Sequence, residues 1–428
     1  MMRLRVWGAV SLAALLFLIP LVTFAFSPPL QQDNSIARIT EQQRRGHYQQ
    51  ALYSLDVLAA QQGWSPDRLR LAGELWRESG DLTRAVPYWE AASTDLPDDL
   101  LLTRILADAY LALERWPDAV DQLAQLVAAD PQDAWAQYHL GVLRAAFDAP
   151  AAREHLQVAA NAPAYRALAN GLLRVLGNQS EELLRVMQVG LMLADAEQWS
   201  FAELVFQHAA DISPAYPDAL AYVGLARAKQ GKDGSTQIAQ AVQLGPDRAV
   251  VRYVEGLHLR DANDLTGSLA ALAQAAALDP QNPAYYAELG TAYQLLGDLD
   301  NAERWLRVAV TASHEDPRFQ QLLAIFYAET AVEGVTDVEA IATILPDDAE
   351  VQAGLGWSFY RSGDTEAALE QLDRVLTQQP DHARSLFYKA QILLETGQLT
   401  ESRTLLEQVS SLESPFQAQA QRLLEGLG

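Results

Sequence analysis

The sequence predicts an all-α protein: a solenoid of about ten helix-turn-helix units preceded by one transmembrane helix. Three observations predict it: proline recurs at a fixed interval, glycine or alanine recurs at a fixed place within that interval, and an uncharged stretch lies near the N-terminus. Three pairs of prolines are 34 residues apart: Pro97 and Pro131, Pro246 and Pro280, and Pro346 and Pro380. Such a period is typical of arrays in which each unit is one pair of helices.

The N-terminal segment predicts a membrane anchor. Residues 6–26, "VWGAVSLAALLFLIPLVTFAF", contain no charged side chain. As a helix this stretch would span about 30 Å, the thickness of the hydrocarbon core of a bilayer. Arg3 and Arg5 precede it, so the positive-inside rule leaves residues 1–5 in the cytoplasm and the rest of the chain outside. Residues 27–33 are polar and contain proline, and we expect a short tether there.

A cleaved secretory signal is the alternative reading of the same segment. Such signals have an apolar region of about 7–15 residues and a cleavage site of small residues. Ala25 and Ser27 have the spacing of a cleavage site, but Pro28 would follow the cut. An uncleaved signal anchor is therefore the prediction, and a secreted or periplasmic protein released by cleavage stays open as the alternative.

Small residues recur inside the repeat when each unit is numbered so that its closing proline is position 32. Position 20 is mostly alanine, as at Ala85 and Ala302. Two helices can pack closely only where the residues at their crossing point are small. We therefore interpret the glycines as packing residues, whose conformational disadvantage of about 1 kcal/mol is offset by the close approach. Position 8 is glycine in most units: Gly73, Gly141, Gly190, Gly224, Gly256, Gly290 and Gly356.

These recurring residues strongly resemble those of the tetratricopeptide repeat (TPR) family. The resemblance covers residues 34–415 and implies a right-handed superhelix of paired antiparallel helices. The pattern is irregular at residues 164–182, where an extra helix or a hinge is expected, and at residues 317–348, where a shortened unit is expected. Residues 416–428 are expected to form a terminal helix that shields the last apolar face.

Composition excludes several classes of chemistry. The chain has no cysteine, which rules out disulfides, thiolate metal sites and a cysteine nucleophile. Its seven histidines show no metal-ligand spacing, and its net charge of −24 argues against a nucleic-acid partner. Once the repeats and the anchor are subtracted, no stretch could hold a catalytic domain. We therefore expect no enzymatic activity, no cofactor, no metal and no small-molecule substrate.

The family resemblance also implies where a partner would bind. In TPR proteins, positions 2, 5, 9 and 12 of the first helix of each unit line a concave groove that takes a protein or peptide. Exposed aromatic residues in such a groove are typical of binding hot spots. Internal packing of the same residues is an open alternative. In this sequence the predicted groove residues are Trp135, Tyr138, Met187, Leu191, Tyr253, Leu257, Trp357, Tyr360 and Phe387.

The resulting functional prediction is a membrane-anchored scaffold or adaptor. It would mediate protein–protein interaction on the extracytoplasmic side of a bacterial membrane, because repeat solenoids present long surfaces to partners. The alternative is a structural subunit of a stable membrane complex, which would contact its neighbours through the outer face and the terminal helix.

Overall fold

Eight of the 24 helices that the structure describes begin at an aspartate that caps them. Eight aspartates accept hydrogen bonds from backbone N–H groups in the first turn of a helix, where these groups have no partner within the helix. The recurrent Gly-Asp turn shows how one hairpin is closed: Gly297 has a φ of +83°, which favours glycine, and Asp298 accepts from the Asn301 N–H. The eight caps are Asp81, Asp99, Asp133, Asp148, Asp264, Asp298, Asp348 and Asp364.

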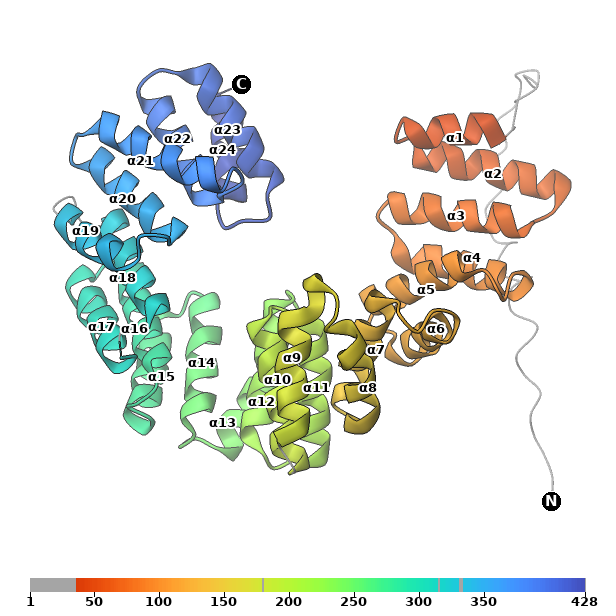
Figure 1. Ribbon diagram of the computed structural model, residues 1–428, viewed down its shortest axis with the longest axis horizontal. Coiled ribbons are helices and arrows are strands. Elements are labelled where there is room, and N and C mark those ends of the chain that lie inside the picture. The colour runs from red at the N-terminus through yellow and green to blue at the C-terminus, as the bar shows by residue number, and fades with distance from the viewer. Residues whose placement is uncertain (1–35, 179–180, 315, 331–333, 428) are drawn as a thin grey trace. The chain divides into compact units, whose positions relative to one another are not determined.

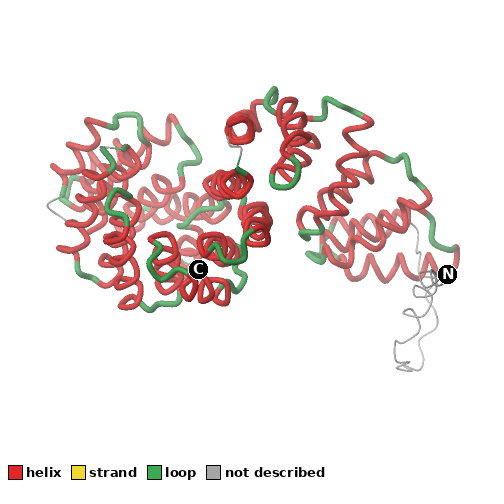
Figure 2. Tube along the Cα trace, turned by 90° about the horizontal axis from the view of Figure 1, so that it is seen from below, coloured by secondary structure: helices red, strands yellow, loops and turns green. Residues whose placement is uncertain are grey.

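The computed structural model describes residues 36–178, 181–314, 316–330 and 334–427, and these residues are helices joined by short loops (Figure 2). The chain divides at Pro131 and Gln132 into two units. The first unit contains three helical hairpins, each made of a first and a second helix: α1 (Ile36–Arg44) with α2 (Tyr48–Gln62), α3 (Pro66–Glu78) with α4 (Leu82–Asp95), and α5 (Leu100–Ala112) with α6 (Trp116–Ala129) (Figure 1).

The second unit begins with one hairpin, continues through a single helix, and then returns to hairpins. The first hairpin is α7 (Ala134–Ala145) with α8 (Ala149–Ala159), and the single helix is α9 (Pro163–Asn178). The next three hairpins are α10 (Glu182–Asp195) with α11 (Trp199–Ile212), α12 (Pro217–Lys229) with α13 (Ser235–Leu244), and α14 (Ala249–Asp261) with α15 (Leu265–Leu278).

The C-terminal part of the second unit repeats the same arrangement and ends in an unpaired helix. Its hairpins are α16 (Pro283–Leu296) with α17 (Leu299–Ala312), α18 (Pro317–Thr330) with α19 (Val335–Ile344), α20 (Ala349–Arg361) with α21 (Thr365–Gln378), and α22 (Ala383–Glu395) with α23 (Leu399–Ser411). The terminal helix α24 (Gln417–Gly426) packs on α23. The irregular segment 164–182 thus contains most of α9. The irregular segment 317–348 contains the hairpin α18/α19, whose second helix is short.

Each helix packs mainly on its nearest neighbours in the chain. Within the second unit, the first helix of one hairpin also contacts the first helix of the next, as α12 does with α14 and α20 with α22. A chain that makes only such local contacts buries its apolar faces by stacking, which is how a repeat solenoid is held together. In the described residues, the fold is therefore an all-helical stack of hairpins.

The position-8 glycines lie where the two helices of a hairpin cross. A Cβ added at Gly290 would lie 2.7 Å from Leu306 Cγ and 3.1 Å from the Ala302 carbonyl oxygen. The large side chain at position 24 therefore lies over the glycine, and the small residue at position 20 lets the backbone carbonyl approach beside it. A large side chain of the second helix would likewise lie within 3.0 Å of a Cβ added at six further glycines: Gly73, Gly141, Gly190, Gly224, Gly256 and Gly356.

The predicted anchor lies outside the described residues, as do residues 1–5 and the predicted tether 27–33. In the part of the chain that the structure describes, no helix is both long enough and apolar enough to cross a membrane.

Candidate partner-binding surface

The predicted groove residues lie on the first helices of the second unit, and the structure divides them by exposure. Leu191 is exposed, whereas Trp135, Tyr253, Trp357 and Tyr360 are half-buried. The remaining four are buried and offer almost no surface to a partner: Tyr138, Met187, Leu257 and Phe387.

Tyr138 is buried because the single helix α9 and the start of α11 cover it. Its ring stacks on Tyr165 of α9 with a centroid separation of 4.5 Å, and its hydroxyl donates to Gln198 Oε1 at 2.8 Å. Burial raises the pKa of this hydroxyl to about 12. Sequence reasoning could not place Tyr138 in the core, because Gln198 is 60 residues away and α9 interrupts the repeat.

The aromatic residues at the C-terminal end of the second unit stack on one another. Trp357 stacks on Tyr388 with a centroid separation of 4.6 Å and contacts Tyr360 at 5.3 Å. Phe387 stacks on Phe416, which directly precedes α24, at 4.9 Å. The Tyr360 hydroxyl donates to the Glu395 carboxylate, and this bond raises the tyrosine pKa to about 12. These contacts join the first helices of the last two hairpins, α20 and α22, and connect α22 to the residue that precedes the terminal helix.

An ion-pair network that the sequence did not reveal links α18, α20 and α22. Arg384 donates to Glu329 Oε1 at 2.6 Å and also pairs with Glu350. Tyr388 donates to the same Glu329 oxygen at 2.8 Å, and His382 Nε2 lies 3.2 Å from Glu350 Oε1. Burial opposes the charge on Glu350, but the hydrogen bond from His382 and the positive charge of Arg384 outweigh it, and the pKa of Glu350 is lowered. Every charge in this network has a partner, so we interpret the network as a structural contact that holds α18, α20 and α22 together.

In the first unit, a similar polar contact joins consecutive first helices. Arg70 of α3 donates to Asp99 Oδ2 at 3.0 Å, and Asp99 is also the residue that caps α5. The Asp99 carboxylate therefore neutralises the arginine and satisfies the start of the next helix at once.

Exposed large apolar residues occur on several first helices, including α5, α16 and α18, and α10 carries two that are a heptad apart. Leu184 and Leu191 are both exposed, and they are seven residues apart, so they lie on one face of the helix. Leu184 was not among the predicted groove residues, although it occupies position 2 of its unit. We name this pair the α10 leucine pair.

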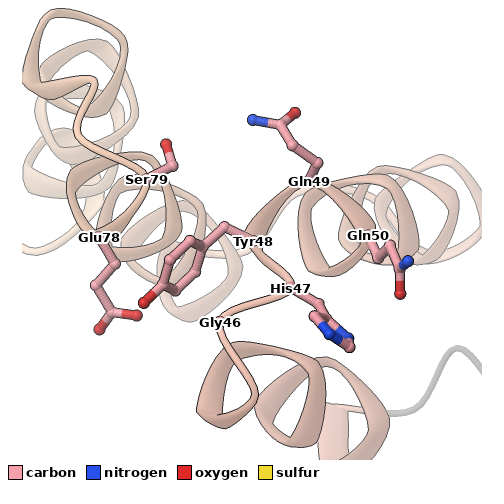
Figure 3. A pocket seen from close by; sticks show the side chains of 7 residues that line it. All are labelled: Gly46, His47, Tyr48, Gln49, Gln50, Glu78 and Ser79. Atoms are coloured by element: carbon pink, nitrogen blue, oxygen red, sulfur yellow. The ribbon is translucent and has the colours of Figure 1, made fainter. Parts of the chain in front are cut away.

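A shallow hollow of about 360 Å³ lies in the first unit at the α1–α2 turn (Figure 3). Figure 3 shows the side chains of Tyr48 and Glu78 on one side of the turn and those of His47 and Gln50 on the other. Glu78 accepts two hydrogen bonds from Gln43 Nε2, each at 3.0 Å. The hollow is open and polar, and its residues form no pairing of a nucleophile with a base.

Within the described residues, no three histidine, aspartate or glutamate side chains gather in a way that could hold a metal ion. The half-buried His155 is used in packing: its Nδ1 lies 2.7 Å from Gln137 Oε1, and burial together with the charge of Arg144 lowers its pKa. No feature of the residues that the structure describes points to catalysis.

Two tetratricopeptide-repeat family models match the sequence, one over residues 353–411 and the other over residues 77–140 and 259–325. A curated relative, superkiller protein 3 of Saccharomyces cerevisiae, is 32% identical over 75 residues, which are 17% of this chain and 5% of that protein. The chain therefore matches only a small part of the length of this relative. The matched family models support the tetratricopeptide-repeat family for this chain.

Several solved structures resemble the chain at low sequence identity. Yeast Tom70 is 14% identical, with a TM-score of 0.44 over 85% of this chain and 95% of that one. Cut9, solved as an APC/C hetero-tetramer with Hcn1, is 14% identical, with a TM-score of 0.47 over 91% and 95%. YrrB, described as a TPR protein with an unusual peptide-binding site, is 18% identical, with a TM-score of 0.29 over 44% and 97%.

Proposed function

We propose that this tetratricopeptide-repeat chain is a non-catalytic scaffold that binds a protein or peptide on its first helices. Residues 6–26 would anchor it in a bacterial cytoplasmic membrane, and the repeats would lie on the extracytoplasmic side. The observation that carries the binding proposal is the α10 leucine pair. Two exposed leucines on one helical face suit the apolar stripe of a partner helix or peptide.

The membrane part of the proposal is supported by the sequence of residues 6–26. The segment is long enough for a bilayer and contains no charge, and Arg3 and Arg5 favour a cytoplasmic N-terminus. A cleaved signal would instead release the repeats as a periplasmic or secreted protein.

Photocrosslinking in the native cell tests the binding proposal. A photoreactive amino acid at Leu191 is expected to capture one defined protein, because this side chain is exposed on the proposed surface. The matched control is the same probe at Leu399, an exposed leucine at the start of a second helix. The captured protein should also be lost from a variant that carries Leu184→Arg. Equal capture from Leu191 and Leu399, or capture that survives Leu184→Arg, would remove the α10 leucine pair as the binding surface.

The membrane topology can be tested with a single introduced thiol. The chain has no cysteine, so Leu399→Cys creates a unique and exposed labelling site. We expect a membrane-impermeant maleimide to label this variant in intact spheroplasts, and we expect mass spectrometry to find the N-terminus uncut. Labelling only after lysis would place the repeats in the cytoplasm, and a new N-terminus near residue 26 would show a cleaved signal.

A further inference from the structure

The second helices carry a surface separate from the α10 leucine pair. Three consecutive second helices, α11, α13 and α15, each end in an exposed large apolar residue. We name this set the second-helix row: Ile212, Leu244 and Leu278. We propose that the row binds a basic amphipathic helix of a partner protein.

One member of the row, Leu244, lines a hollow into which an apolar side chain can enter. The hollow lies between α11 and α13 and has a volume of about 410 Å³. Ala210, Pro214, Leu220 and Leu244 give it an apolar lining, and the other lining residues are three glutamines and Asp211. Because residues from both α11 and α13 line this hollow, the C-terminal ends of these two helices lie side by side.

The charges around the row select a cationic partner. None of the three helices contains lysine or arginine, and each row residue has a carboxylate within three positions: Asp211, Asp247 and Asp279. The row also lies at the C-terminal ends of three helices, where the helix dipole places partial negative charge. A peptide with lysine or arginine beside its apolar stripe would match this pattern, whereas an acidic peptide would be repelled.

Three arginines near the row do not reverse this charge: Arg248 and Arg252, which follow Leu244 in the sequence, and Arg307, which lines a hollow with Pro280 and pairs with Glu303 at 2.8 Å. Arg248 Nε donates to Asp218 Oδ1 at 3.0 Å. Arg252 donates to the Pro246 carbonyl oxygen and to Glu255 Oε2, both at 2.7 Å. Each guanidinium is therefore offset by its own carboxylate, and the three flanking aspartates remain in excess.

A partner helix would lie across the C-terminal ends of the three helices. Every seventh residue of such a helix advances about 10.5 Å along its axis. A partner helix with an apolar residue at each heptad would therefore offer successive side chains to Ile212, Leu244 and Leu278. The corresponding last residue of α17 is the small Ala312, so the row ends at α15.

This inference rests on one part of the proposed function, namely that the chain binds other proteins. The surface is different, so the two can fail independently. Crosslinking at Leu191 tests the α10 leucine pair, and the experiment below tests the second-helix row.

The test is binding of a synthetic helix to the full-length chain in neutral detergent. The probe is a fluorescent peptide of about three heptads with leucine at every seventh position and lysine beside it. Its comparison peptide has glutamate in place of every lysine. Fluorescence anisotropy is measured with the wild type and two double variants. The row variant is Leu244→Lys/Leu278→Lys, and the matched variant is Leu295→Lys/Leu399→Lys, which adds the same charge at leucines of similar exposure (51 and 45% against 59 and 52%).

We expect the lysine probe to bind the wild type and the matched variant alike, and the row variant to lose about tenfold in affinity. The glutamate peptide should not bind. A Leu244→Ala/Leu278→Ala variant should weaken binding in the same direction without added charge. If both lysine variants weakened the affinity for the lysine probe equally, the attraction would be that of the bulk charge, and the proposal would be overturned. Binding of the glutamate peptide, or no binding of the lysine probe to the wild type, would also overturn it. If the wild type formed dimers that only the row variant failed to form, the row would bind a second copy of this chain. That result would also overturn the proposal.

Discussion

Replacing Trp89 by alanine is expected to lower the free energy of opening of the α3/α4 hairpin by about 4 kcal/mol. Trp89 is fully buried, and its indole lies directly over Gly73, where an added Cβ would be 2.3 Å from Nε1. The substitution would leave a cavity at the point where the two helices cross. It would also remove the indole donor from the Arg70 carbonyl oxygen, which now accepts at 3.3 Å. Hydrogen exchange of the α3 and α4 amides measures the loss.

The matched control is Tyr53→Ala in the same unit. Tyr53 is exposed, so its removal should change stability by less than about 0.5 kcal/mol. If Trp89→Ala were as mild as Tyr53→Ala, the helix crossing at Gly73 would not be the main source of stability of this hairpin.

The Gly234→Ala variant should lose about 3 kcal/mol of stability in the α12/α13 hairpin, although it adds only one methyl group. An added Cβ would lie 2.1 Å from the Gly224 carbonyl oxygen and 2.8 Å from its carbonyl carbon. These are backbone atoms, so no side chain can turn aside and the two helices must separate. Urea denaturation monitored by hydrogen exchange in α12 and α13 measures the effect.

Two other glycines separate this backbone collision from ordinary glycine effects. Gly231 is in the same turn, has a φ of +71° and has nothing within 4 Å of an added Cβ, so Gly231→Ala should lose only about 1 kcal/mol through backbone strain. Gly177 lies in α9 with nothing within 4 Å of an added Cβ, and Gly177→Ala should be neutral or slightly stabilising. Equal effects at Gly234 and Gly231 would show that turn geometry, and not the approach of the two helices, decides the cost.

The burial of the predicted groove residues changes how the scaffold is expected to bind. Phe387 and Tyr138 are packing residues in this chain, so a partner must use the side chains that the first helices leave exposed. The α10 leucine pair is such a site, and the second-helix row is a separate exposed site on the second helices. A scaffold with two such surfaces could hold two partners at once, which is the advantage of a long repeat surface over a single pocket.

The repeat itself was predictable because its determinants are local and periodic. The closing prolines lie two residues after their second helices, as Pro280 follows Leu278 and Pro346 follows Ile344. Proline cannot continue a helix, so its spacing gives the unit length directly. The Gly-Asp turns are equally local, because glycine supplies the left-handed conformation and aspartate caps the next helix.

The sequence by itself determined the helical hairpins, their number to within about one and their small crossing residues, since each depends on neighbours within one unit. The tertiary structure alone decided which predicted groove residues are exposed. Tyr138 is buried through Gln198, 60 residues away, and Arg384 is clamped to Glu329, 55 residues away. These contacts depend on how successive hairpins meet and on the extra helix α9, and no single period in the sequence encodes them.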